Sequence, residues 1–260
     1  MAGLMVGIIM EGGNPLAMIN IPAALIVFGG TLGVTIASVG LKSFMAVPKL
    51  FIKGFAGDVP DLAERRTLLV SFAEKARRDG LLALDDEASK VEDDFTRKGL
   101  QLVVDGTDPD VVDEVLGHEI DNMARRHKEG AHVFEAGGGY GPTMGVLGTV
   151  MGLVHVLENL SNPETLGHSI AGAFIATLYG VGIANVILLP MALRLKGMAA
   201  AEKELRTMTL EGILGIQAGD NPRIVADKLA TFLPPSEREA ADAAQAPAGG
   251  AGAPDLEMAA

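Results

Sequence analysis

Long uncharged stretches alternate with strongly charged ones along this chain. Three runs lack Asp, Glu, Lys and Arg altogether: Ile21–Leu41, Tyr140–Leu157 and Ile170–Leu193. The shortest has 18 residues, and as a helix it spans about 27 Å, close to the thickness of the hydrocarbon core of a bilayer. A fourth run, Met1–Met10, ends at Glu11 and is about half a span long. The pattern therefore predicts an all-α membrane protein with four transmembrane helices, the first of them truncated.

The glycine-rich stretch GGGYGPTMGVLGTVMGLVHVL, residues 137–157, has an alternative interpretation as a phosphate-binding loop. Such a loop requires a Gly-Lys-Ser/Thr ending, and no lysine or arginine occurs between Lys128 and Arg194. Within the membrane interpretation, Gly145, Gly148 and Gly152 follow helical spacing and clear one face for the close approach of another helix. The stretch therefore indicates a membrane helix.

Lysine and arginine flank the runs on one side only. They follow the first and last long runs, whereas Glu158–Ser169 and Glu11–Asn20 contain none. Because basic flanks remain in the cytoplasm, both chain ends and a large helical insertion between the second and third spans are expected there. The predicted boundaries are a partial first span with its outer loop at 1–18, the second span at 19–45, the cytoplasmic helical domain at 46–138, the third and fourth spans at 139–160 and 168–196, cytoplasmic C-terminal helices at 197–235, and a disordered tail at 236–260.

Caps and breakers divide the cytoplasmic part. Asp58 is the expected N-cap of its first helix, with Pro60 in the first turn and Gly80 at the C-cap. A second helix is expected over residues 81–104, and a third from Asp108-Pro109 toward the membrane. Asn221-Pro222 is expected to start a short helix after the last span.

Composition narrows the chemistry. The net charge is −12, which argues against nucleic acid. There are no cysteines, and the five histidines show no metal-ligand spacing, so neither a metal nor a cofactor is expected. The long runs carry hydroxyls but no Asp, Glu, Lys or Arg, although an ion path through a membrane usually needs an ionisable group. Two interpretations stay open: the hydroxyls bond their own helix carbonyls, or some line a polar path completed by a carboxylate from a partner helix. These hydroxyls belong to Thr31, Thr35, Ser38, Thr143, Thr149 and Thr177.

Several segments in order carry a resemblance to a known family. They are IPAALIVFGGTLGVT, ARRDGLLALDDE, KGLQLVVDGTDPD, GPTMGVLGTVMGLVHVLENL and SIAGAFIATLYGVGIANVILLPMALRLK. Together they resemble MotA, the flagellar motor stator subunit of the MotA/TolQ/ExbB proton channel family, over about residues 5–233. The family has a full first span, and the shortened one here suggests a native start further upstream.

The resemblance implies a non-enzymatic membrane machine of the cytoplasmic membrane. MotA subunits form a ring in the lipid bilayer around a MotB pair, whose single transmembrane aspartate carries H⁺ or Na⁺ inward. The family's ion-path hydroxyls correspond to Thr149 and Thr177, and its coupling prolines to Pro142 and Pro190. The charges that face the rotor protein FliG correspond to Arg77, Arg78, Asp85 and Asp86, with Glu87 as a substitute for an acidic position that is Ala88 here.

Simpler interpretations of these residues remain. Arg77 and Arg78 lie in the last turn before Gly80, where cations complement the helix dipole, and Asp85 and Asp86 are typical of a solvated face. Two other functions are also open: an ExbB/TolQ-like energiser of outer-membrane processes, and a permease or scaffold without a rotor. A permease often shows internal repeats, and none is found.

Overall fold

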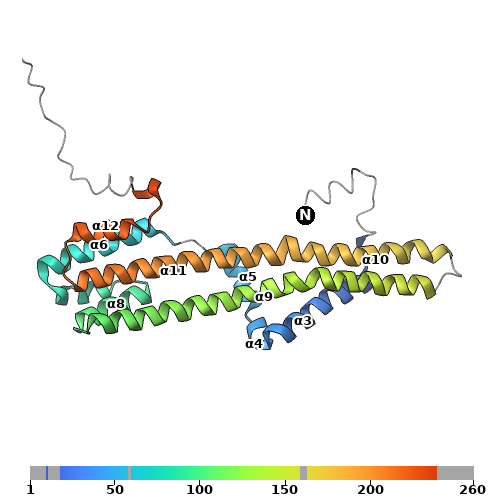
Figure 1. Cartoon of the computed structure of the whole chain (residues 1–260), viewed down its shortest axis with the longest axis horizontal. Coiled ribbons are helices and arrows are strands. Elements are labelled where there is room, and N and C mark those ends of the chain that lie inside the picture. Colours follow the sequence, from blue (N-terminus) through green and yellow to red (C-terminus); the bar gives the residue numbers. More distant parts are fainter. Residues whose placement is uncertain (1–9, 11–17, 58–59, 159–162, 239–260) are drawn as a thin grey trace, which may run out of the picture. The chain divides into compact units, whose positions relative to one another are not determined.

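The chain is helical throughout its described part. A computed structural model describes residues 10, 18–57, 60–158 and 163–238, and no strand occurs among them (Figure 1). It divides into two compact units. The first unit comprises Met1–Val59 and Asp121–Ala201, and the second comprises Pro60–Ile120 and Glu202–Ala260. Most of the predicted partial span at 1–18 and nearly all of the predicted tail at 236–260 lie outside the described residues.

The first long apolar run forms one continuous helical segment in the first unit. It consists of α2 (Ile21–Ala24), the π-helical turn η2 (Leu25–Gly29) and α3 (Gly30–Val39). Asn20 caps its start by accepting a hydrogen bond from the Ala23 amide at 3.0 Å. Gly40, with φ +80°, ends it, because glycine has no Cβ to disfavour this conformation. The short helices α4 (Leu41–Phe44) and α5 (Val47–Ala56) follow.

Two further helical stretches are long and apolar enough to cross a membrane. One is α9 (Pro109–Glu158). The other, Leu166–Gln217, includes most of α10 (Pro163–Ile183), the π-helical turn η4 (Ala184–Leu188) and α11 (Leu189–Gln217). With the first segment, Ile21–Val39, they make three candidate spans among the described residues.

Glycines bring α9 and α10 into direct backbone contact. A Cβ at Gly148 would lie 2.8 Å from the Cβ of Ala176, and one at Gly152 would lie 2.8 Å from the Cβ of Ala173. A Cβ at Gly145 would lie 3.0 Å from the Ala176 carbonyl oxygen. The prediction that these three glycines clear a face for another helix is therefore confirmed.

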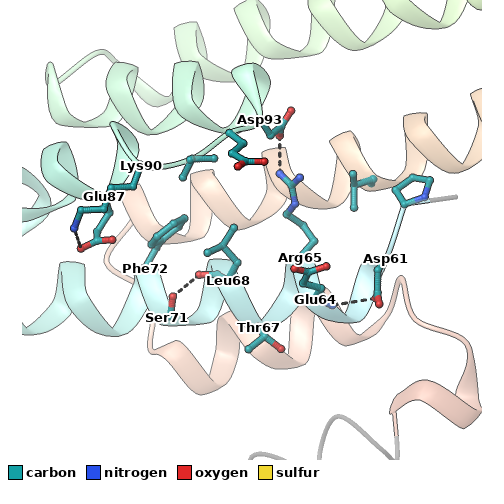
Figure 2. A pocket seen from close by; sticks show the side chains of 14 residues that line it. Asp61, Glu64, Arg65, Thr67, Leu68, Ser71, Phe72, Glu87, Lys90 and Asp93 are labelled. Carbon is teal, nitrogen blue, oxygen red and sulfur yellow. Dashed lines mark hydrogen bonds and ion pairs between the residues drawn. The ribbon is translucent and has the colours of Figure 1, made fainter. Parts of the chain in front are cut away.

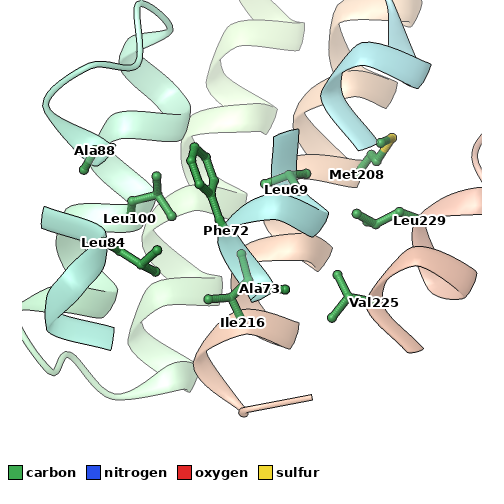
Figure 3. Close-up of a cluster of buried hydrophobic side chains, with 10 residues drawn as sticks. All are labelled: Leu69, Phe72, Ala73, Leu84, Ala88, Leu100, Met208, Ile216, Val225 and Leu229. Atoms are coloured by element: carbon green, nitrogen blue, oxygen red, sulfur yellow. The ribbon is translucent and has the colours of Figure 1, made fainter. Parts of the chain in front are cut away.

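The second unit is a small helical domain with its own core (Figure 3). Its elements are α6 (Leu62–Asp79), the 3₁₀ turn η3 (Leu81–Leu84), α7 (Asp85–Ala88), α8 (Asp94–Val104), the first part of α9, the last part of α11, and α12 (Pro222–Ala230). The core consists of Leu69, Phe72, Ala73, Leu84, Ala88, Leu100, Met208, Ile216, Val225 and Leu229. Since these residues come from α6 to α8, α11 and α12, the predicted insertion and the C-terminal helices share one hydrophobic core.

The structure corrects two predicted boundaries. The N-cap of α6 is Asp61, which accepts hydrogen bonds from the amides of Ala63 and Glu64, so Pro60 lies before the helix. Asp58 lies outside the described residues. The second helix expected over 81–104 was also wrong, because the chain forms η3 and α7, turns, and starts α8 at a new cap, Asp93. That carboxylate accepts from the Thr96 amide, and such a cap favours a fresh helix start.

Other predicted boundaries are confirmed. Gly80 is the C-cap of α6 with φ +86°, α9 begins at Pro109, and Asn221 caps α12 with Pro222 in the first turn. Each of these helix ends depends on the backbone preference of one or two residues, so the sequence alone was enough to predict it.

Candidate functional site

Two threonine hydroxyls meet between α9 and α10 in the first unit. Thr149 Oγ1 lies 2.5 Å from Thr177 Oγ1, and both side chains are partly buried. Their contact depends on the glycine-lined packing, because a Cβ at Gly145 would lie 3.2 Å from the Cα of Thr177. The structure thus brings together both hydroxyls that the family resemblance assigned to the ion path.

The Thr149 hydroxyl also contacts two carbonyl oxygens, those of Ala173 at 2.9 Å and Gly145 at 3.1 Å. A carbonyl only accepts, and a hydroxyl has a single hydrogen. The arrangement that uses most contacts has Thr149 donating to a carbonyl and Thr177 donating to Thr149. The lone pairs of Thr177 Oγ1 then receive no hydrogen from the described residues, so this oxygen is suited to accept a hydrogen bond or to ligate a cation.

Both candidate prolines lie in helical segments. Pro142 is inside α9, where its missing N–H leaves the Gly138 carbonyl without its usual donor. Pro190 is the second residue of α11, which begins directly after the π-helical turn η4. A π-turn is a common site of bending or functional adjustment. The coupling position that the resemblance assigns to Pro190 therefore lies beside an irregular turn.

The candidate cations end α6 in the second unit. Arg77 and Arg78 are both exposed. The guanidinium of Arg78 donates to the neighbouring Asp79 carboxylate at 3.0–3.2 Å, and this hydrogen bond with its charge lowers the pKa of Asp79. Within the described part of the chain, Arg77 forms no side-chain hydrogen bond or ion pair. Of the two arginines, Arg77 is the one left available to a partner.

The candidate anions begin α7. Asp85 and Asp86 are exposed, and Asp85 accepts a long 3.4 Å hydrogen bond from Gln101. Glu87 differs, because it accepts from Lys75 at 2.7 Å and from Lys90 at 3.2 Å. These hydrogen bonds lower the pKa of Glu87. Glu87 thus ties α7 to α6 inside the unit, whereas the two aspartates face solvent.

The turn η3 joins these cations to these anions and exposes an apolar side chain that sequence reasoning missed. Leu82 is 76% exposed, whereas its neighbour Leu84 is fully buried. The segment LLAL is apolar throughout, so no pattern in it distinguishes the two leucines. Only the 3₁₀ turn decides which one faces solvent.

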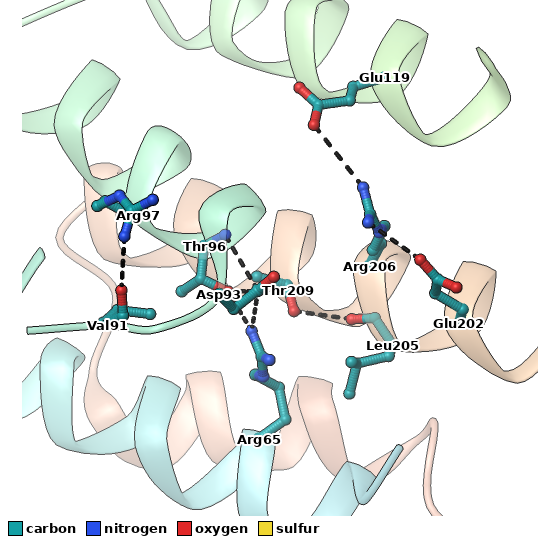
Figure 4. A network of polar contacts seen from close by, with 10 residues as sticks. All are labelled: Arg65, Val91, Asp93, Thr96, Arg97, Glu119, Glu202, Leu205, Arg206 and Thr209. Carbon is teal, nitrogen blue, oxygen red and sulfur yellow. Dashed lines mark hydrogen bonds and ion pairs between the residues drawn. The ribbon is translucent and has the colours of Figure 1, made fainter. Parts of the chain in front are cut away.

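A polar network fixes the start of α8 (Figure 4). Arg65 donates to Asp93 at 2.6 Å, and both contact the Thr96 hydroxyl. Burial raises the pKa of the Asp93 carboxyl, but the hydrogen bonds from Thr96 and Arg65 and the charge of Arg65 together hold it below its ordinary value. Nearby, Arg206 lies 5.1 Å from the Phe95 ring centre and pairs with Glu202. The network holds α8 against α6.

A pocket of about 880 Å³ opens beside this network (Figure 2). Most of the charged side chains that line it are acidic. Both basic side chains in the lining already form ion pairs with lining carboxylates, Arg65 with Asp93 and Lys90 with Glu87. The candidate residues Arg77, Arg78, Asp85 and Asp86 do not line it. Among the described residues, no group of three or more His, Asp or Glu side chains is arranged to hold a metal ion.

Comparison with known proteins gives consistent matches. The MotA/TolQ/ExbB proton channel family matches residues 87–208. Motility protein A of Borreliella burgdorferi is 46% identical over 66% of each chain, and Motility protein A of Bacillus subtilis is 35% identical over 90% of this chain and 87% of its own. The solved flagellar MotAB stator complex of Bacillus subtilis matches with a TM-score of 0.85 and 34% identity, covering 92% of this chain and 94% of the matched chain.

Proposed function

Because the chain belongs to the Motility protein A family of flagellar stator subunits, we propose that it converts inward flow of H⁺ or Na⁺ into torque on the flagellar rotor. The MotA/TolQ/ExbB group is a family of proton channels rather than of enzymes. The chain is accordingly a multi-pass protein of the inner membrane.

The proposed topology has four spans with both chain ends in the cytoplasm. Three spans are supported by the helical stretches long and apolar enough to cross, and the fourth falls on residues 1–18. The orientation rests on the basic flanks after the first and last long runs, Lys42, Lys49, Arg194 and Lys196. The second unit, with its charged exterior, then lies in the cytoplasm as the part that meets the rotor.

The Thr149–Thr177 pair is the observation that carries the proposal. The three long apolar runs contain no Asp, Glu, Lys or Arg, so the carboxylate of the ion path comes from another chain. A MotB-like partner with one span supplies it as a carboxylate, and several copies of this chain surround that partner as a ring. Thr177 Oγ1, with lone pairs not used by the described residues, is placed to accept a hydrogen bond from the protonated carboxyl or to ligate a sodium ion.

Coupling and torque are assigned to two further sets of residues. Pro142 and Pro190 interrupt the backbone hydrogen bonding of α9 and α11, which makes these positions the points where a change at the ion path alters helix direction. Arg77, Arg78, Asp85 and Asp86 then form the contact with the rotor protein FliG. Glu87 contributes charge to that surface while its carboxylate holds α7 to α6.

The test is Thr177→Val, which keeps the side-chain shape and removes the hydroxyl. Swimming speed is expected to collapse while the amount of protein in the membrane stays at the wild-type level. Thr143→Val is the matched control, since Thr143 is exposed and donates to its own helix at Tyr140. Normal swimming of the Thr177→Val cells would remove Thr177 from the ion path.

A further inference from the structure

One side of the last membrane helix stays uncovered by the rest of the first unit. Two other sides are covered. Ala173 and Ala176 pack against the glycines of α9, and Tyr179 stacks on Phe28 of the first helical segment, with the ring centres 5.5 Å apart. Between residues 172 and 185, the exposed side chains are those of Phe174, Leu178, Val181 and Asn185. These four residues, called the α10 stripe below, mark the uncovered side.

The spacing of the α10 stripe is typical of a line of contact between two helices. Successive members are four, three and four residues apart, which is the alternation of the core positions in a coiled coil. Phe174 is 64% exposed, and Leu178 and Val181 are each 43% exposed. Three apolar side chains in a row suit lipid as well as another helix, so the fourth member, Asn185, decides between them.

Asn185 has hydrogen-bonding groups that hydrocarbon does not satisfy. One N–H of its amide donates to the Val181 carbonyl at 3.0 Å. Among the described residues, nothing donates to its carbonyl oxygen or accepts its second N–H, and lipid tails can do neither. The residue lies about 5 Å from the middle of the uncharged run 170–193, within the hydrocarbon core of the bilayer. Polar side chains at that depth face protein rather than lipid.

The α10 stripe adjoins the Thr149–Thr177 pair. Asn185 comes eight residues after Thr177, which is about 12 Å along the helix axis and less than a quarter turn around it. A helix that lies along the stripe therefore meets the Thr177 hydroxyl at one level and the Asn185 amide at another. A second copy of this chain would bring no carboxylate to this face, because its uncharged runs contain none. The single span of the partner brings one.

We propose that Asn185 is a positioning residue for the partner's span, which packs along the α10 stripe and hydrogen-bonds to this amide through a hydroxyl or amide of its own. The inference rests on the proposed stator function, which supplies the partner. A polar residue in an otherwise apolar seam fixes the register of two helices, so Asn185 sets the level at which the carboxylate faces Thr177. The polar group that meets Asn185 then lies about eight residues from that carboxylate, toward the cytoplasmic end of the partner's span.

The first experiment maps what covers the stripe. The chain has no cysteine, so an introduced cysteine is its only thiol. Val181→Cys is expressed with a set of partner variants that each carry one cysteine along the span, and the native membranes are oxidised with copper phenanthroline. Ile187→Cys is the matched control, because Ile187 is also 43% exposed but lies about half a turn from Asn185. Disulfides with the partner are expected from Val181→Cys, at partner positions three or four residues apart, and not from Ile187→Cys.

The second experiment tests the amide. In the Val181→Cys background, Asn185→Leu keeps a side chain of similar size and removes the hydrogen-bonding groups, whereas Asn185→Gln keeps them. Asn185→Leu is expected to lower the ratio of the main disulfide to the one formed a helical turn away by about threefold or more. Asn185→Gln is expected to restore most of the ratio. A side chain that only stabilised the fold would lower all disulfides together, and immunoblots verify the amount of each variant in the membrane.

Three results overturn the proposal: no disulfide between Val181→Cys and the partner, including the case in which two copies of this chain are joined instead; equal disulfides with the partner from Ile187→Cys; or an unchanged ratio in Asn185→Leu. The comparison of Val181→Cys with Ile187→Cys keeps the native amide, so it gives a result even where Asn185→Leu does not fold. None of these readouts depends on swimming, whereas Thr177→Val tests the ion path by swimming. Failure of the stator proposal and failure of this one are therefore distinguishable.

Discussion

Replacing Gly180 with alanine puts a methyl group into the tightest contact between α9 and α10. The new Cβ would lie 2.4 Å from the Gly141 carbonyl oxygen and 2.9 Å from the Gly145 Cα. Both are backbone atoms, so no change of side-chain rotamer relieves the overlap. The two helices must move apart at this point.

The size of the movement follows from the contact distance. Ordinary van der Waals contact begins at 3.4 Å, so the helices must separate by about 1 Å. A shift of that size stretches the 2.5 Å contact between Thr149 and Thr177 to about 3.5 Å, beyond a normal hydroxyl hydrogen bond. Overpacking costs about 1–3 kcal/mol, and the better helix propensity of alanine returns about 1 kcal/mol. The net loss of folding free energy is up to about 2 kcal/mol.

The assay compares Gly180→Ala with Gly182→Ala. A Cβ at Gly182 meets nothing within 4 Å, so this control carries the propensity gain without the overlap. Thermal melting followed by circular dichroism suits an all-helical chain without tryptophan, and swimming speed reports function. Gly180→Ala is expected to melt below the wild type and to swim poorly, whereas Gly182→Ala melts at or slightly above it. If the two variants melt and swim alike, the close packing of α9 on α10 does not hold the threonine pair together.

Three further predictions concern the second unit. Arg77→Asp should reduce swimming speed while the amount of protein in the membrane stays normal, and a matching charge reversal on the rotor should recover part of the loss. Replacing a single candidate charge by a neutral residue should have a small effect, because an exposed ion pair contributes about 0–1 kcal/mol. Gly80→Ala should destabilise the second unit by about 1–2 kcal/mol, because φ is +86° at this position. Gly117→Ala should not destabilise it, because a Cβ there meets nothing within 4 Å. Equal resistance of the two variants to proteolysis would contradict this prediction. Asp93→Asn should speed amide hydrogen exchange in α8 by about tenfold or more, and Asp94→Asn should not. Because the folded-state pKa of Asp93 is lowered, its stabilisation is present above the ordinary aspartate pKa and is lost as the pH falls through the folded value, so exchange in the wild type should approach that of the variant in acid.

Much of the secondary structure follows from local signals in the sequence. The uncharged runs locate the membrane helices because burying a charge in hydrocarbon is costly whatever the neighbouring helix. Gly80, Asp108-Pro109 and Asn221-Pro222 locate helix ends because each depends only on backbone preferences of a few residues. The glycine spacing on α9 indicated a face for close packing before the partner helix was known.

Where two local signals in the sequence compete, only the structure shows which one sets the helix boundary. The sequence pattern predicted Asp58 as the cap of this helix, but the amides of Ala63 and Glu64 donate to Asp61. The region 81–104 has helical periodicity, yet burying Leu84 and Ala88 in the core and capping α8 at Asp93 break it into separate turns.

Contacts between distant residues were decided by tertiary structure alone. The resemblance to MotA named Thr149 and Thr177, but their 28-residue separation gives no indication that the hydroxyls touch; the register of α9 on α10 sets that. The same applies to Thr31 and Thr35, which the sequence presents as ordinary membrane hydroxyls and which the structure buries without a hydrogen-bond partner among the described residues. Helix periodicity determines which face a side chain occupies, whereas the packed neighbours determine whether that face offers it a carbonyl, another hydroxyl or only apolar atoms.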